Sequence, residues 1–226
     1  MNPLFIVEIG HNWNGDIELA KKMIWVAKDF GADIIKVQLY DIDKIKIPSD
    51  THYQELKDSQ LTRKQMIELS EEVKKAGIEF MASAFDTERV QWLEEIGVKR
   101  HKLASRSIYD QDLIQTMVKT GKPIIVSLGT WKKKELPIIE NAEFLYCLTR
   151  REIERFGVRN FPEKFDKLAG FSDHTIGIEY IMKAIDRGAR IIEKHFTLDK
   201  NLPGCDQAGS ATTDEFKEIV DYAKSK

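Results

Sequence analysis

Thiols and long apolar runs are both scarce in this chain of 226 residues. Cys147 and Cys205 are its only cysteines, and they provide neither a disulfide framework nor the paired-cysteine spacing of a zinc site. Free thiols are typical of a reducing cytoplasm. No apolar stretch approaches the ~20 residues that a membrane helix needs, and the opening residues, MNPLFIVEIG, lack the basic start of a signal peptide. We therefore expect a cytoplasmic protein that does not bind a membrane.

An excess of charge of one sign is absent as well. The 35 Lys and Arg residues nearly balance the 37 Asp and Glu residues, which gives a net charge of -2. Such a chain has no overall field that attracts DNA or RNA, so we expect no nucleic-acid partner. Hydrophobic residues make up 42% of the sequence, enough for a substantial core. The chemistry must therefore follow from where individual polar residues lie.

Short apolar runs alternate with longer amphipathic segments along the whole chain. Apolar residues at helical spacing, such as Met66, Leu69 and Val73, mark helix faces that would pack on a sheet. Strands that alternate with helices pair in parallel. A closed (β/α)₈ barrel (TIM barrel), formed as a single domain over residues 1–226, is the economical arrangement at this length, and an open doubly wound sheet is the alternative. The strand-like runs are 5–10, 33–39, 79–85, 100–105, 123–129, 143–149, 167–173 and 190–196, and the helical segments are 17–30, 62–76, 87–96, 110–120, 177–187 and 213–225.

The connection after the fifth strand breaks this alternation. The segment 130–142 is short and contains Pro137, which leaves little room for a full helix. We expect the helix between strands five and six to be shortened or missing.

Polar side chains collect near the carboxyl ends of the predicted strands, where the active sites of parallel barrels lie. Successive residues of a strand point to opposite faces, so Lys36 shares a face with Gln38, and Glu193 shares one with His195. Polar groups inside a barrel are costly unless they are paired or used. Further candidates at strand ends are Glu8, Ser83, Lys102, Ser105, Ser127, Ser172 and His174.

Each of these residues also has a structural interpretation. A single buried histidine is more often a hydrogen-bonded core residue than a ligand. His174 and His195, however, end neighbouring predicted strands beside acidic groups, which favours a divalent metal site. Either Lys36 or Lys102 alone could pair with a structural carboxylate. Together, with several hydroxyls nearby, they favour an anionic ligand such as a phosphate or a carboxylate.

Seven runs of residues give the chain a resemblance to a known family. They are FIVEIGHNWNGDIELAKKMI, GADIIKVQLY, FMASAFD, HKLAS, GKPIIVSLG, GFSDHTIGIE and IIEKHFTLDKNLPGCDQAGS, and they span residues 5 to about 220. In this order and spacing the sequence resembles the sialic acid synthases, that is, the N-acetylneuraminate synthases and their relatives for legionaminic and pseudaminic acids. The last two runs are the most specific.

The resemblance implies a transferase that condenses phosphoenolpyruvate with the open-chain aldehyde of an N-acetylated amino sugar, such as N-acetylmannosamine or a related aldose, and releases phosphate. It also implies a barrel fold and a divalent metal, usually manganese, with His174 and His195 as ligands. Gln38 and Asp206 align with sugar contacts, and Glu8 with an acidic group near the metal. The residues that align with groups holding phosphoenolpyruvate are Lys36, Ser83, Lys102, Ser105, Ser127 and Ser172.

These residue types suit that chemistry. Neutral imidazoles bind Mn²⁺, Zn²⁺ or Fe²⁺ and leave coordination positions open. A bound metal can then polarise the carbonyl that the methylene carbon of phosphoenolpyruvate attacks. Glu8 or Glu193 could move the proton, and the sequence does not choose between them.

Three departures from the family fall on the sugar side of the implied site. The family has a small C-terminal antifreeze-like domain that supplies an arginine to a partner's site, and we expect this chain to be a short form without it. After the sixth strand, CLTRREIERF replaces an Asn or Ser followed by Tyr-Pro, and after the fourth, Arg106 and Ser107 replace a Gly and an acidic residue. We therefore expect an altered acceptor, and Arg106 favours one with negative charge, such as a phosphorylated sugar.

Two other functions stay open at this point. One is a metal-dependent aldolase or lyase that acts on a 2-oxo acid, and the other is a catalytically silent barrel that serves as a subunit. Retention of both histidines and both lysines argues against the silent barrel. We expect a homodimer, or a partner chain that supplies the missing lid.

Overall fold

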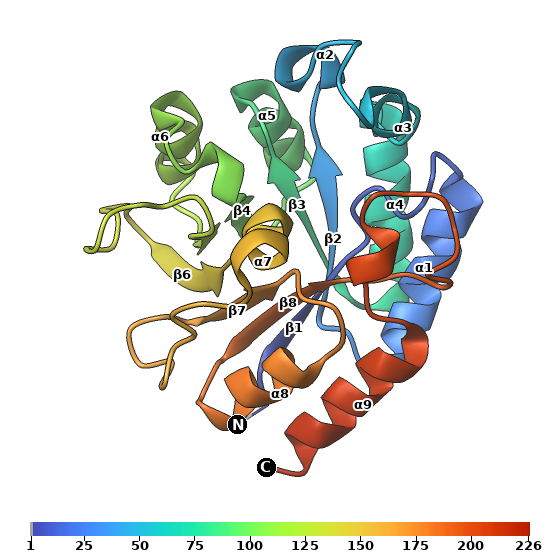
Figure 1. Ribbon diagram of the computed structural model, residues 1–226. Helices are drawn as coiled ribbons and strands as arrows, with labels where there is room; N and C mark the ends of the chain where they lie inside the picture. The colour runs from blue at the N-terminus through green and yellow to red at the C-terminus, as the bar shows by residue number, and fades with distance from the viewer. Residues whose placement is uncertain (1) are drawn as a thin grey trace.

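Eight parallel strands close into a barrel in chain order in the computed structural model, which describes residues 2–226 (Figure 1). Each strand pairs with the next, and β1 closes the barrel against β8. The predicted (β/α)₈ barrel is therefore confirmed, and the open doubly wound sheet is excluded. The strands are β1 (Leu4–Glu8), β2 (Ile34–Leu39), β3 (Glu79–Ala84), β4 (His101–Leu103), β5 (Ile124–Ser127), β6 (Ala142–Cys147), β7 (Gly170–Asp173) and β8 (Ile191–His195).

Helices cover most of the outside of the barrel (Figure 1). The first, α1 (Ile17–Phe30), begins after Asp16, whose side chain accepts hydrogen bonds from the next turn's backbone, and ends at Gly31, which adopts a left-handed φ of 97°. These two signals fix the helix at its predicted bounds. The others are α2 (Ile42–Ile45), α3 (Tyr53–Asp58), α4 (Arg63–Ala76), α5 (Thr87–Glu95), α6 (Gln111–Lys119), α7 (Arg150–Phe156), α8 (Glu179–Asp186) and α9 (Thr213–Lys224).

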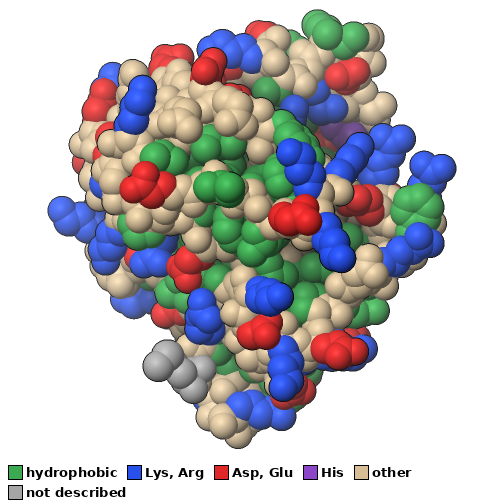
Figure 2. All heavy atoms as spheres, turned by 90° about the vertical axis from the view of Figure 1, so that its left-hand side faces the viewer, with side chains coloured by type: hydrophobic (Ala, Val, Ile, Leu, Met, Phe, Trp, Pro, Cys, Tyr) green, Lys and Arg blue, Asp and Glu red, His purple; other side chains and the backbone are tan. Residues whose placement is uncertain are grey.

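The connection from β5 to β6 contains no helix in the described structure, as predicted from its sequence. It runs over the surface as a loop in which Trp131 stacks on Tyr109, with ring centroids 5.4 Å apart. Figure 2 faces this side of the molecule and shows hydrophobic side chains at its centre. The outer face of the barrel is therefore less covered here than elsewhere. Large apolar side chains exposed in this part of the chain are Tyr109, Leu136, Ile138 and Phe156.

Two layers of apolar side chains hold the barrel together. The larger lies between the strands and the helices, and a smaller one fills the interior away from the mouth. Below the carboxyl ends of the strands the barrel is thus a packed core and not a pore. The smaller layer consists of Ile6, Ile34, Met81, Ile125, Leu145, Ala169 and Ile191.

β7 and β8 approach each other closely at Gly170. A Cβ added there would lie 1.8 Å from the carbonyl oxygen of Ile191, so only glycine fits. This contact fixes the spacing of the two strands that lead to His174 and His195.

No helix of residues 2–226 combines the length and the apolar character needed to span a bilayer.

Candidate active site

A buried polar network lies inside the barrel at the carboxyl ends of its strands. Lys36 of β2 forms an ion pair with Glu8 of β1, and its ammonium group lies 3.4 Å from the Oγ of Ser83 on β3. All three side chains are buried. A lysine on an interior face is costly unless it is paired, and here the neighbouring strands supply the partners.

The network continues around the barrel through Glu193 of β8. Its Oε1 accepts a hydrogen bond of 2.9 Å from the Oγ of Ser172 on β7, and it lies 3.7 Å from Nζ of Lys102 and 3.8 Å from Nζ of Lys36. Lys102 also donates to the Oγ of Ser127, at 2.7 Å. The predicted interior residues of β1, β2, β3, β4, β5, β7 and β8 thus meet in one cluster.

The cluster brings two ammonium groups and two carboxylates together out of water. Burial alone would raise the pKa of Glu193, but the charges of Lys102 and Lys36 lower it by more. The pKa of Glu193 therefore lies below its usual range, and the group is ionised. Burial lowers the pKa of Lys36 to about 8, although Glu193 opposes the shift. Lys36 and Lys102 share Glu193, and Glu8 pairs with Lys36, so two carboxylates balance the two ammonium groups. The ammonium groups and the neighbouring serine hydroxyls are the donors that an anion would meet here.

His174 and His195 lie next to each other at the ends of β7 and β8, with ring centroids 5.3 Å apart. Burial lowers the pKa of His195 to about 3, so its ring is neutral at neutral pH. For His174, burial lowers the pKa but Cys147 and Asp206 raise it more. The structure thus places the two histidines of these strand ends side by side.

The donors around this pair fit a divalent cation. Nδ1 of His195 is buried and has no hydrogen-bond partner among residues 2–226, and it lies 3.7 Å from Oδ2 of Asp206. A neutral imidazole with a free ring nitrogen, beside a second imidazole and a carboxylate, is a donor set for Mn²⁺, Zn²⁺ or Fe²⁺. His174 and His195 are therefore the residues that would hold such a metal, with Asp206 close to His195.

Asp206 joins the histidine pair to the loop that follows β1. Its Oδ2 lies 2.9 Å from Nδ1 of His11, and Nε2 of His11 lies 3.2 Å from Oε1 of Gln38. Burial alone would raise the pKa of Asp206, but in acid, where the rings are protonated, His195 and then His11 keep it well below its usual range. Gln38 and Asp206, the two predicted sugar contacts, are thus connected through His11.

Ser105 lies apart from the lysine cluster. Its Oγ accepts a hydrogen bond of 3.0 Å from the backbone N–H of Gly129 and lies 3.5 Å from Sγ of Cys147. Burial raises the pKa of the Cys147 thiol, but the hydrogen bond to His174 and the charge of that ring lower it more. Ser105 is therefore connected to His174 through the side chain of Cys147, which lies between them.

Two hollows open beside α7 at the mouth of the barrel. One, of about 390 Å³, is bounded by α7 and reaches His174 and Gly209. The other, of about 870 Å³, lies between α7 and the loop that precedes α3, and it reaches Asp206. Arg150 lines both hollows and contacts the carbonyl oxygen of Cys205, so the start of α7 lies between them.

Four residues in this region were not predicted from the sequence as site residues: His11, Glu55, Cys147 and Cys205. His11 lies in the loop that follows β1 at the mouth of the barrel. That position was a usable signal, because active-site residues of parallel barrels lie in such loops. The cysteines gave no signal, since neither belongs to a motif, and Glu55 lies on the short helix α3, which the sequence pattern did not predict.

A closed parallel barrel with a buried cationic cluster and a histidine pair at its mouth has the form of a barrel enzyme. Comparison with known proteins identifies the family. The model of the NeuB family matches residues 23–142 and 146–225. This chain therefore belongs to the NeuB family.

The chain is similar to other proteins over nearly its whole length. The N,N'-diacetyllegionaminic acid synthase of Legionella pneumophila is 32% identical over 97% of this chain and 71% of its own length. An uncharacterized protein of Methanocaldococcus jannaschii is 35% identical over 96% of this chain and 69% of its own. Among solved structures, the N-acetylneuraminic acid (sialic acid) synthetase of Leptospira borgpetersenii superposes with a TM-score of 0.86 at 29% identity, over all of this chain and 84% of that one.

Proposed function

We propose that this protein condenses phosphoenolpyruvate with an aldose, an N-acetylated amino sugar of the N-acetylmannosamine type, to form a nonulosonic acid and inorganic phosphate. The observation that carries the proposal is the pair of buried ammonium groups, Lys36 and Lys102, that share Glu193 directly beneath the histidine pair. Membership of the family and the names of the relatives support the same reaction class.

The lysine cluster is suited to hold phosphoenolpyruvate. Ammonium groups and hydroxyls are strong partners for phosphate and carboxylate oxygens. Lys102 with Ser127, and Lys36 with Ser83, form two such pairs on neighbouring strands. We assign them to the anionic groups of the substrate, with Ser172 and Ser105 at the edges of the same site.

Proton transfer falls to the carboxylates and to Lys36. The new bond joins the methylene carbon of phosphoenolpyruvate to the aldehyde carbon, whose oxygen takes up a proton, while water adds at C2 and the C–O bond to phosphate breaks. Glu193 is ionised, so it can accept the proton of the attacking water. Glu8, paired with Lys36, is placed to return a proton through that ammonium group.

His174 and His195, with Asp206 close to His195, would hold the divalent cation, which we take to be Mn²⁺ from the resemblance to the family. When bound there, it would supply Lewis-acid polarisation of the aldehyde oxygen. The neutral state of His195 is the state that such binding requires.

The acceptor that fits the mouth carries negative charge. Arg106 lies at the end of β4, its guanidinium 5.5 Å from the ring of Phe85. Lys46, Arg150 and Arg151 line the larger hollow that leads to Asp206. Asp50 and Glu154 line it too and lie near Lys46 and Arg150, so a phosphate on the far end of the sugar would rely chiefly on Arg151.

A phosphate-release assay tests the proposal. The protein with Mn²⁺ and phosphoenolpyruvate is incubated with a panel of aldoses and N-acetylated amino sugars, each with and without a 6-phosphate. We expect phosphate only when an acceptor aldehyde is present, and a higher kcat/KM for the phosphorylated member of each pair.

The alternatives give different results in the same assay. A 2-oxo-acid lyase would form pyruvate from a nonulosonic acid and release no phosphate from phosphoenolpyruvate. A silent barrel would bind neither Mn²⁺ nor phosphoenolpyruvate in calorimetry. Either result contradicts the proposed synthase.

A further inference from the structure

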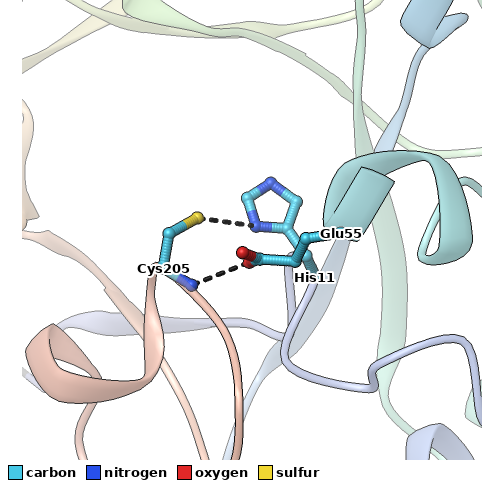
Figure 3. A group of neighbouring side chains, drawn as sticks. All are labelled: His11, Glu55 and Cys205. Atoms are coloured by element: carbon cyan, nitrogen blue, oxygen red, sulfur yellow. Dashed lines mark hydrogen bonds between the residues drawn. The ribbon is translucent and has the colours of Figure 1, made fainter. Parts of the chain in front are cut away.

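His11, Glu55 and Cys205 meet at the rim of the barrel from three separate connections. His11 follows β1, Glu55 lies on α3, and Cys205 lies in the loop after β8. One donor atom of each lies within 4.8 Å of the other two. Figure 3 shows the sulfur of Cys205 and the carboxylate of Glu55 both next to the ring of His11. The three side chains are partly buried, so the cluster is neither a surface coincidence nor closed to ions.

The hydrogen bonds of His11 leave one ring nitrogen without a protein donor. Nε2 faces the side-chain oxygen of Gln38, at 3.2 Å, and so carries the hydrogen in a neutral ring. Nδ1 faces Oδ2 of Asp206, 2.9 Å away, and Sγ of Cys205, 4.0 Å away. Burial lowers the pKa of His11 but Asp206 raises it more, so a proton on Nδ1 joins the ring to that carboxylate. A bound metal cation would take the place of this proton.

We propose that His11, Cys205 and Glu55, together with Asp206, form a second cation site that binds a borderline-soft divalent metal such as Zn²⁺. The site is distinct from the His174–His195 pair and does not depend on the proposed reaction.

The distances match the edges of a tetrahedral site after small shifts. Zn–N and Zn–S bonds of about 2.0–2.1 and 2.3 Å place nitrogen and sulfur ~3.5 Å apart. Sγ of Cys205 would move toward Nδ1 of His11 by a few tenths of an ångström from its 4.0 Å, and the carboxylate of Asp206 would move back by a similar amount from its 2.9 Å. Glu55 is already close, because its Oε1 accepts a hydrogen bond of 2.7 Å from the backbone N–H of Cys205.

The loops that carry these ligands are tied together. Nδ2 of Asn12 donates to the carbonyl oxygen of Phe196 and to the Oγ of Ser210, each at 2.8 Å. The Oγ of Ser210 in turn donates to the carbonyl oxygen of Asp206, at 2.8 Å, so the loop of His11 is tied to the loop of Cys205 and Asp206 before any ion binds. A preorganised site of this kind loses little freedom on binding.

The donor set selects the class of metal. One imidazole, one thiolate and carboxylates favour Zn²⁺, Co²⁺ or Fe²⁺ over Mg²⁺ or Ca²⁺, which prefer oxygen alone. Binding displaces the proton of the Cys205 thiol, since the thiolate is the ligand, and the proton that His11 shares with Asp206. Asp206 also lies 3.7 Å from His195, so the two cation sites share one carboxylate.

Cobalt titration of the chelator-treated full chain tests the proposal. A cobalt–thiolate bond gives a charge-transfer absorption in the near ultraviolet, which a site of histidine and carboxylate lacks. We expect two equivalents of Co²⁺ to bind to the unaltered protein, and one of them to produce this absorption. In C205S we expect the absorption to disappear while one equivalent still binds. Zinc added to the unaltered protein should displace the thiolate-bound cobalt.

The second cysteine provides the matched control. Cys147 neighbours His174, so C147S should keep the absorption if the thiolate comes from Cys205, and so should H174A. His11→Gln, which keeps a hydrogen-bonding side chain, should reduce the affinity of the absorbing site without removing the other. Persistence of the absorption in C205S, its loss in C147S, or a single equivalent bound with no absorption overturns the proposal. None of these outcomes bears on turnover of phosphoenolpyruvate, which is measured separately by phosphate release.

Discussion

The ammonium group of Lys194 lies 2.6 Å from Oδ2 of Asp173, and neither side chain is exposed to solvent. Each residue directly precedes a member of the histidine pair: Asp173 comes before His174, and Lys194 before His195. Because adjacent residues of a strand face opposite ways, this ion pair lies on the helix side of β7 and β8. Lys194 also donates to the carbonyl oxygen of Thr175, at 2.8 Å, and thereby holds the turn after His174.

Removal of Lys194 should destabilise the barrel strongly. Lys194→Met leaves the carboxylate of Asp173 buried without its partner, which costs about 3–5 kcal/mol in the free energy of unfolding. Urea denaturation measures this change in the free energy of unfolding. The double variant with Asp173→Leu should recover much of the loss, because no charge then remains buried. Arg63→Ala, which removes an exposed pair with Glu95, should change the stability by less than about 1 kcal/mol. Equal effects of the two single variants would contradict this interpretation.

Loss of one histidine of the pair should abolish metal-dependent turnover. We expect His195→Ala to lower kcat for phosphate release by more than about 100-fold, the scale of removing one electrostatic stabiliser, and to lose one bound Mn²⁺ in calorimetry. Lys224→Ala is the control, since Lys224 is exposed at the last residue of α9. Full Mn²⁺-dependent turnover in His195→Ala would remove that residue from the mechanism.

Lys102 should act mainly on binding of phosphoenolpyruvate. Lys102→Met keeps the length of the side chain and removes its charge, so hydrogen bonds worth roughly 1.5–3 kcal/mol are lost and KM should rise by about 10–100-fold. Steady-state kinetics with the acceptor saturating measures the change. Lys134→Met, in the exposed loop between β5 and β6, should leave KM as it is. A KM that is unchanged in Lys102→Met contradicts the assigned role.

The charge of Lys36 should set the alkaline limit of activity. Its pKa is lowered to about 8 by burial, so the side chain is cationic below that pH and loses its proton above it. We expect kcat/KM for phosphoenolpyruvate, which reports groups of the free enzyme, to fall as the pH rises through about 8. Lys36→Arg keeps its charge at high pH and should shift this fall upward. The same alkaline limit in both proteins would assign it to another group.

The fold was predictable because local signals agree with the tertiary structure. Asp16 and Gly31 bound α1, and alternation along β2 placed Lys36 in the interior. α7 was not predicted because none of its residues is buried, so it has no apolar periodicity. Its capping box, in which Thr149 and Glu152 exchange hydrogen bonds with each other's backbone, was the one signal available.

The site was predictable where strands form it and not where loops do. Strand order alone brings Ser172, Glu193 and Lys102 together, since the carboxyl ends of all the parallel strands lie at the same end of the barrel. The contact of His11 with Asp206 joins loops at opposite ends of the chain, and it depends on loop conformations that no sequence period encodes. The sugar side, built mostly from such loops, was accordingly the part least determined by the sequence.

The open segment of the helix layer between β5 and β6 gives the barrel an uneven resistance to local opening. Five of the six residues of β2 are buried, whereas four of the six of β6 are only partly so. Because local stability follows the apolar contacts that an element makes, we expect the amide hydrogens of β6 to exchange with solvent faster than those of β2. Local opening between β5 and β6 would then occur on the side of β6 that faces away from β8 and its histidine.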